Sequence, residues 1–141
     1  MTSDEIKNLA AQLNEQGKMW FLDGASEEQL AEFEEKHQIK LPPQYKDWLR
    51  FSDGGEFFLP AGVQMYGVAH KPIIDVDYND RPDDSYIVIG AMSSGDPILC
   101  SKNHEKISIY NHEANRIESD EIYPDFFAFL GDLYNLLGIG G

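Results

Sequence analysis

The stretch of sequence that decides the fold is LPPQYKDWLRFSDGG, which runs from Leu41 to Gly55. Pro42 biases the residue before it away from helical dihedral angles, whereas Pro43 is suited to open a helix, because the first helical turn does not need its N–H group. Gly54 or Gly55 can adopt the left-handed conformation that ends a helix. Three large apolar residues between these ends share one helical face: Tyr45, Trp48 and Leu49. The stretch therefore predicts a short helix whose inner face is buried.

Two further helices are predicted upstream of this stretch. Thr2 and Glu5 form a capping-box pattern, and apolar residues then recur at helical spacing until Gly17. Ser26 and Gln29 repeat the pattern before an amphipathic segment that places Leu30, Phe33 and His37 on one face. Its outer positions are acidic: Glu27, Glu28, Glu32, Glu34 and Glu35. Between the two helices, the apolar run 19–22 is interpreted as a segment packed against the core, with a ligand-facing Trp20 as the alternative.

Downstream of Gly55 the sequence becomes typical of β-structure. Short runs rich in β-branched and aromatic residues alternate with Gly, Pro, Asn and Asp, which predicts a mostly antiparallel sheet of about six strands. The candidate strands are 57–59, 64–69, 73–78, 86–91, 98–101, 107–110 and 115–118. The clearest element is a hairpin in which Ile98 and Cys100 share a face with Ile107 and Ile109. A last, widely apolar helix is predicted from Pro124, placed in its first turn, to Gly138.

Composition favours one folded domain over residues 1–141, of the α+β class, with the N-terminal helices and the C-terminal helix packed on the sheet. Apolar residues make up 42% of the chain, which is enough for a core. A single cysteine cannot close an internal disulfide, and neither a secretory signal nor a membrane span is visible, so a cytoplasmic protein is expected. The net charge of −14 argues against direct binding to nucleic acid or to an anionic membrane.

Two motifs suggest chemistry, and each departs from its pattern. The segment 75–80 begins like a calcium loop, but Asp80 and Tyr86 stand where an EF-hand has Gly and Glu. The segment 91–95 approximates a nucleophile elbow, but a β-like segment follows it instead of a helix. The histidines and the cysteine show no zinc-ligand spacing: His37, His70, His104, His112 and Cys100. The sequence therefore predicts no catalytic residues, no cofactor and no dedicated metal site.

Several segments in order resemble the SUKH superfamily of Smi/Knr-like domains. The most specific is the Leu41–Gly55 stretch, which is similar to that family's Leu-Pro pair, aromatic helix and terminal Asp-Gly-Gly. The residues of this stretch build the helix and its ends, so most of the stretch should be buried and the binding residues should lie elsewhere. The other matching positions follow along the chain: Tyr66, Gly67, Ile89, Gly90, Gly95, Asp96, Ile109, Tyr110, His112 and Glu113.

The resemblance implies a protein that binds another protein and catalyses no reaction. Bacterial members of the superfamily commonly neutralise a cognate toxin as immunity proteins, and the acidity of this chain suits a basic toxin domain such as a nuclease. A cytosolic regulatory or scaffold module without a toxin partner is the alternative, and a metal-assisted hydrolase using the carboxylates of 75–84 ranks last. The candidate partner-binding residues are Asp75, Asp77, Asp80, Asp83, Asp84, Glu113, Glu118, Asp120 and Glu121.

Overall fold

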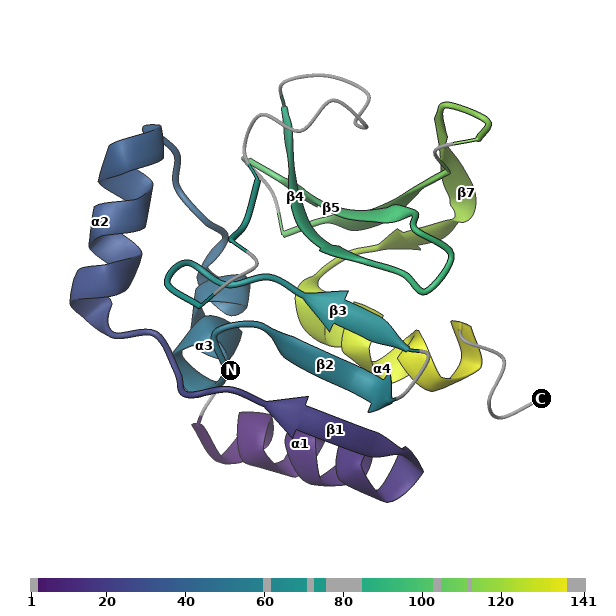
Figure 1. The fold of residues 1–141 in the computed structure, drawn as a ribbon, viewed down its shortest axis with the longest axis horizontal. Coiled ribbons are helices and arrows are strands. Elements are labelled where there is room, and N and C mark those ends of the chain that lie inside the picture. The colour runs from purple at the N-terminus through teal and green to yellow at the C-terminus, as the bar shows by residue number, and fades with distance from the viewer. Residues whose placement is uncertain are drawn as a thin grey trace.

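The computed structural model describes residues 3–59, 62–70, 73–75, 85–102, 105–111 and 113–136, with the backbone alone at 3, 118–121 and 134–136. Helices precede, interrupt and follow a set of strands along the chain (Figure 1). The helices are α1 (Ser3–Gln16), α2 (Glu27–His37), α3 (Pro43–Phe51) and α4 (Phe126–Leu136). The strands are β1 (Lys18–Phe21), β2 (Gly55–Leu59), β3 (Val63–Met65), β4 (Tyr86–Ala91), β5 (Pro97–Ser101), β6 (Ile107–Asn111) and β7 (Arg116–Tyr123).

Within these ranges the strands form one antiparallel sheet, in which the spatial order β1 to β7 is also the order along the chain. The α+β class and the antiparallel meander are therefore confirmed, although the sheet has seven described strands instead of about six. The predicted hairpin is also confirmed, because Ile98 pairs with Ile109 and Cys100 pairs with Ile107.

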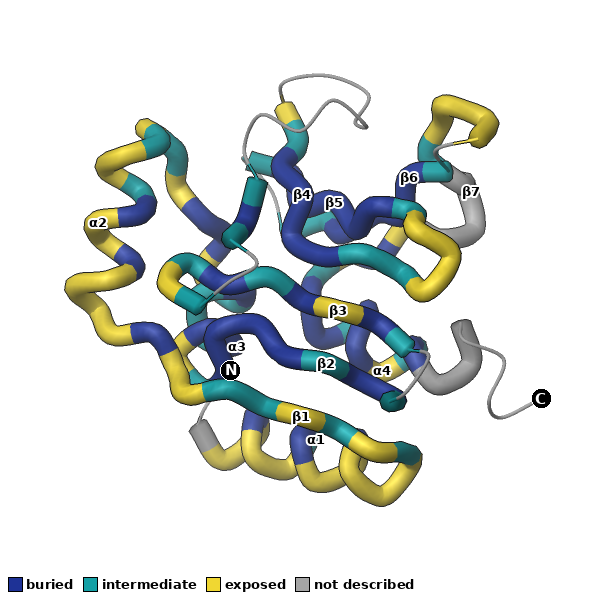
Figure 2. The backbone as a smooth tube through the Cα atoms, viewed as in Figure 1, coloured by how far each residue is buried: buried dark blue, intermediate teal, exposed yellow. Residues whose placement is uncertain are grey.

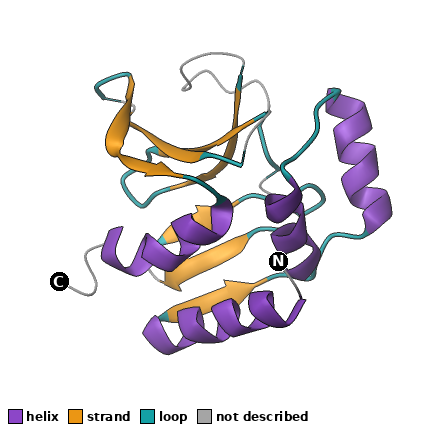
Figure 3. Cartoon of the chain, turned by 180° about the vertical axis from the view of Figure 1, so that it is seen from behind, coloured by secondary structure: helices purple, strands orange, loops and turns teal. Residues whose placement is uncertain are grey.

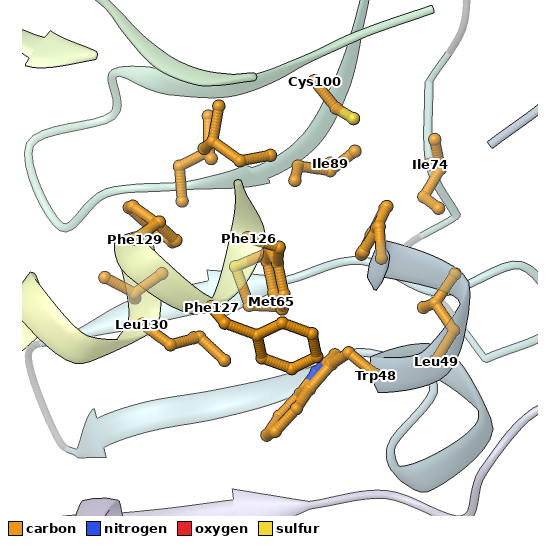
Figure 4. Packing of buried hydrophobic residues seen from close by; sticks show 14 of the residues in the cluster. Trp48, Leu49, Met65, Ile74, Ile89, Cys100, Phe126, Phe127, Phe129 and Leu130 are labelled. Atoms are coloured by element: carbon orange, nitrogen blue, oxygen red, sulfur yellow. The ribbon is translucent and has the colours of Figure 1, made fainter. Parts of the chain in front are cut away.

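One face of the sheet is covered by helices. Seen from behind, α1, α3 and α4 lie against strands β1 to β3, while α2 stands at the side of the molecule (Figure 3). The main core lies between these helices and the sheet, where side chains from α3 and α4 meet those of the central strands (Figure 4). No helix of the described residues lies on the opposite face of β1 to β3 (Figures 1 and 3).

The Leu41–Gly55 stretch has the structural role that its sequence predicts. Helix α3 begins at Pro43, and Trp48 is only 1% exposed, with its ring near those of Phe21, Phe57 and Phe126. Gly54 and Gly55 follow with φ angles of 96° and 130°, which side chains other than glycine rarely adopt. A Cβ atom on Gly55 would also lie 2.7 Å from the Trp20 carbonyl oxygen, so only glycine fits where β1 crosses this turn.

The two predicted upstream helices are present. The Ser26–Gln29 capping box is complete, since the Gln29 N–H donates to Ser26 Oγ at 3.1 Å and the Ser26 N–H donates to Gln29 Oε1 at 2.9 Å. The capping role of Thr2 lies outside the described residues. At the other end of the chain, Pro124 precedes the last helix instead of lying in its first turn. Asp125 begins that helix, because its carboxylate accepts a hydrogen bond from the Ala128 N–H at 2.8 Å.

Two strand predictions were wrong in position, and one apolar run whose secondary structure was not predicted forms a strand. The run 19–22 is mostly an edge strand, β1, in which side chains alternate between the core and the solvent. The predicted strand 64–69 ends at Met65, because the N–H groups of residues 68–70 turn toward one carboxylate instead of a neighbouring strand. Of the predicted strand 73–78, only Ile73 and Asp75 make isolated bridges, and residues 76–78 lie outside the described part.

Candidate protein-binding surface

The uncovered face of the sheet carries a row of side chains from four strands. Trp20 on β1 lies opposite Glu56 on β2, which lies opposite Gln64 on β3, which in turn lies opposite Ala91 on β4. Directly opposed residues of antiparallel strands point to the same face. Met19 and Phe21, the neighbours of Trp20, pack against the core on the other face. The row therefore lies on the side of the sheet that the helices leave open, and we call it the open-face row.

Trp20 is the most exposed large apolar side chain among the described residues, at 58%, and only Ile122 joins it in that class, at 42%. Figure 2 shows exposed backbone positions in the middle of both β1 and β3, where Trp20 and Gln64 lie. The interpretation of Trp20 as part of a segment buried against the core is therefore wrong for this residue. Because aromatic residues are enriched at protein interfaces, an exposed tryptophan on an uncovered sheet face marks a candidate binding surface.

A groove of about 330 Å³ adjoins the open-face row. Glu56, Gln64 and Ala91 contribute to its lining, so the groove and the row share three residues. Leu59 and Met92 add apolar surface. The groove thus combines one carboxylate, one amide and apolar walls, and Trp20 stands on the strand next to it.

A second hollow of about 650 Å³ lies beside the C-terminal half of α2. Its lining is mixed in charge, since Glu34 and Glu35 face Lys40 and Lys102. Glu34 is already engaged, because its carboxylate accepts from the Leu41 N–H at 2.8 Å and from Lys46 Nζ at 3.4 Å. This hollow is the larger of the two, but its charges are balanced and no exposed aromatic residue adjoins it.

Farther along the sheet, a small apolar cluster lies apart from the main core. Val88, Leu99 and Tyr110 are buried together, although their strand neighbours Ile87 and Ile109 point into the main core. Partly buried side chains pack against the cluster: Tyr66, Tyr86 and Ile117. This part of the sheet is therefore covered by side chains, and it adds little exposed apolar surface to the open-face row.

The Asp53 carboxylate is the most heavily engaged polar group described. Asp53 is 0% exposed, and its two oxygens accept hydrogen bonds from the N–H groups of Val68, Ala69 and His70 at 2.7, 2.9 and 2.9 Å. His70 Nδ1 lies 3.1 Å from the same carboxylate. The loop also packs closely, because a Cβ atom on Gly67 would lie 2.4 Å from the Asp53 carbonyl oxygen. Asp53 thus fixes the loop after β3, a role that its position in the sequence did not reveal.

Ser52 has a similar anchoring role. Its hydroxyl group donates to the Gly54 carbonyl oxygen at 2.7 Å and accepts from the Leu22 N–H at 3.0 Å. Leu22 directly follows β1, so the end of α3 holds both the edge strand and the loop after β3. The residues that resemble the family motif therefore position the open face without lying on it.

The predicted partner-binding residues are only partly described. Asp75 is half-buried beside β4, where its N–H donates to the Val88 carbonyl oxygen at 3.0 Å. Glu113 is exposed in the turn between β6 and β7, and Glu118, Asp120 and Glu121 belong to β7, with only their backbone described. Asp77, Asp80, Asp83 and Asp84 lie outside the described residues. The structure does not place these acidic residues at one site, and none of them belongs to the open-face row.

The motifs that suggested catalytic or metal-binding chemistry can be compared with the described residues. No group of three or more His, Cys, Asp or Glu side chains placed to hold a metal ion occurs in the described part of the chain. Burial raises the pKa of the Cys100 thiol well above its ordinary value, which suits a core residue and not a nucleophile. The elbow-like segment 91–95 is a turn into β5, where the Gly95 N–H donates to the Met92 carbonyl oxygen at 2.9 Å.

No described helix has the length and the apolar character that crossing a bilayer requires. A search of curated proteins gives no match. The model of the SMI1 / KNR4 family (SUKH-1) matches residues 24–132, which include α2, α3, the strands from β2 onward and most of α4. The match covers the Leu41–Gly55 stretch, the Asp53-bound loop and the sheet strands that carry Glu56 and Gln64. The chain therefore belongs to the SMI1 / KNR4 family (SUKH-1).

Proposed function

We propose that this chain is a non-catalytic, cytoplasmic immunity protein that neutralises a cognate bacterial toxin by direct binding. The observation that carries the proposal is the family match over residues 24–132, because the family is of the toxin-immunity type. The fold supports it, since the motif residues that resemble the family are used to build α3 and its ends. The surface is then free to differ between members that bind different partners.

The charge of the chain supports a basic partner. The cations of α3 are paired within the protein, because Arg50 contacts Glu27 and Asp47, and Lys46 contacts Glu34. Other carboxylates on the outer side of α2 remain exposed, with Lys36 beside them: Glu28, Glu32 and Glu35. With 25 acidic and 11 basic residues in the whole chain, the surface has an excess of negative charge. A nuclease is a suitable toxin class, because a protein that binds nucleic acid phosphate presents a cationic surface.

Coexpression tests the proposal directly. The gene for this chain is expressed in bacteria together with the toxin gene encoded next to it, and survival is compared with that of cells expressing the toxin alone. Rescue of growth, together with copurification of the two proteins, is the expected result. Continued killing with both proteins folded and present would refute the proposal for that pair. If no toxin gene lies next to the gene for this chain, the regulatory or scaffold function is favoured instead.

A further inference from the structure

Trp20 and Glu56 are placed to act together. They lie opposite each other in the β1–β2 register, on the open face, and they come from strands that are adjacent in the sheet but separated by α2 and α3 in the chain. Trp20 is 58% exposed, and Glu56 is half-buried and lines the groove. An aromatic surface and a carboxylate thus lie side by side.

Glu56 has no ion-pair or hydrogen-bond partner for its carboxylate among the described residues. Lys18 lies on the same strand as Trp20, but it pairs in register with Leu59 and forms no salt bridge in the described part of the chain. The charged side chains of α3 differ from Glu56, because Arg50 and Lys46 both form ion pairs with carboxylates. A carboxylate without a partner among the described residues favours the approach of a cation.

We propose that Trp20 and Glu56 form a receptor for an arginine side chain of a partner protein, an inference that rests on the proposed function and names where the partner binds. A guanidinium group stacks flat on an indole ring and donates two parallel hydrogen bonds to a carboxylate, whereas an ammonium group does neither as well. The groove along Leu59, Gln64 and Met92 then accepts the residue beside the arginine, and its apolar walls suit an aliphatic side chain.

The occupant is a partner protein and not a second copy of this chain, because of charge. Two copies docked through their open faces would bring together two surfaces of a protein with a net charge of −14, and like charges oppose such contact. A cationic partner is attracted by the same negative charge that repels a second copy. The self-association of the protein is therefore part of the test.

The peptide test uses the full chain labelled with ¹⁵N and a blocked tripeptide, acetyl-Leu-Arg-Leu-amide. The chain has two tryptophans, so the indole N–H region of the spectrum reports separately on exposed Trp20 and buried Trp48. The expected result is a saturable shift of the Trp20 indole signal with the Trp48 signal unmoved. The same peptide with citrulline in place of arginine keeps the shape and removes the charge, and it should bind at least fivefold more weakly.

Variants locate the receptor. Glu56→Gln and Trp20→Ala should each weaken binding of the arginine peptide at least fivefold, while Glu32→Gln, which removes the same charge from the exposed outer side of α2, should leave it unchanged. Urea unfolding checks that the variants fold, which is expected because Trp20 is outside the core. Equal binding of the citrulline and arginine peptides, equal weakening by all three variants, or a dimer in sedimentation that Trp20→Ala abolishes would overturn the inference.

The toxin arm separates this inference from the proposed function. If a neighbouring toxin is neutralised, Trp20→Ala and Glu56→Gln should raise the dissociation rate of the complex at least tenfold, and Glu32→Gln should not. Neutralisation that is indifferent to both open-face variants would overturn the arginine receptor and leave the immunity function standing. Peptide binding of the expected pattern in a chain that neutralises no toxin would support the receptor and overturn the immunity function.

Discussion

The role of Asp53 can be tested by one nearly isosteric change, Asp53→Asn. The carboxylate accepts three backbone N–H groups and lies 3.1 Å from His70 Nδ1, and it is fully buried. Asparagine has the same shape but only one acceptor oxygen. If that oxygen faces the Ala69 and His70 N–H groups, the side-chain NH₂ group must face the Val68 N–H, where two donors meet and no hydrogen bond forms.

The magnitude follows from these contacts. The two retained hydrogen bonds no longer involve a charged acceptor, so each stabilises the fold by about 1 kcal/mol less. A buried Val68 N–H without an acceptor costs about 1–3 kcal/mol in addition. Two effects reduce the sum: Val68 is only half-buried, and removing a charge from the interior relieves its desolvation. We therefore expect Asp53→Asn to lower the free energy of unfolding by about 2–3 kcal/mol, a large share of the stability of a domain.

Urea unfolding followed by circular dichroism measures this loss, and amide hydrogen exchange at residues 68–70 localises it. Asp23→Asn is the matched control, because Asp23 is exposed and, among the described residues, only its main-chain oxygen is engaged, as acceptor of the Asp53 N–H at 3.1 Å. The control should change stability by less than about 0.5 kcal/mol. An Asp53→Asn variant as stable as the control, or one whose residues 68–70 keep full protection, would refute the assigned role.

Three further changes test the packing. Ser26→Ala removes the α2 capping box and should cost about 1 kcal/mol by urea unfolding. Trp48→Ala should cost about 3–5 kcal/mol, and unimpaired stability with lost partner binding would contradict its core role. Burial raises the pKa of Cys100 and of Tyr45, so the folded chain keeps both protons while the unfolded chain loses them. Stability should therefore fall as pH rises above about 8.5, measured by urea titration at increasing pH.

The sequence predicted the parts of the fold whose causes are local. The capping box at Ser26 and the proline at Pro43 each act within one helical turn, and both helices begin where these residues indicate. The hairpin around 98–109 was also found, because alternating apolar residues on both sides of a short turn determine its register. Burial of the 41–55 stretch followed from the helical spacing of its aromatic residues.

The errors arose where distant residues decide the structure. In β1 the alternation of Lys18, Met19, Trp20 and Phe21 was hidden, because an exposed tryptophan looks as apolar as its buried neighbours. The early end of β3 depends on Asp53, which lies 15 to 17 residues before the N–H groups that it binds. The open-face row likewise needs the pairing of β1 with β2 across two intervening helices. No short-range pattern in one sequence contains these contacts.

The two features of the surface favour different steps of binding. The exposed carboxylates of α2 act at a distance and through water, so they raise the rate of encounter with a cationic partner and lose that effect in salt. Trp20 and Glu56 act only at contact, where a stacked and hydrogen-bonded guanidinium is shielded from water, so they determine how slowly the complex separates. Acidity is common to many proteins and selects only the sign of a partner's charge. The pairing of an exposed tryptophan with an unpaired carboxylate selects a geometry, and for this reason the specificity of the protein is expected on the open face of the sheet.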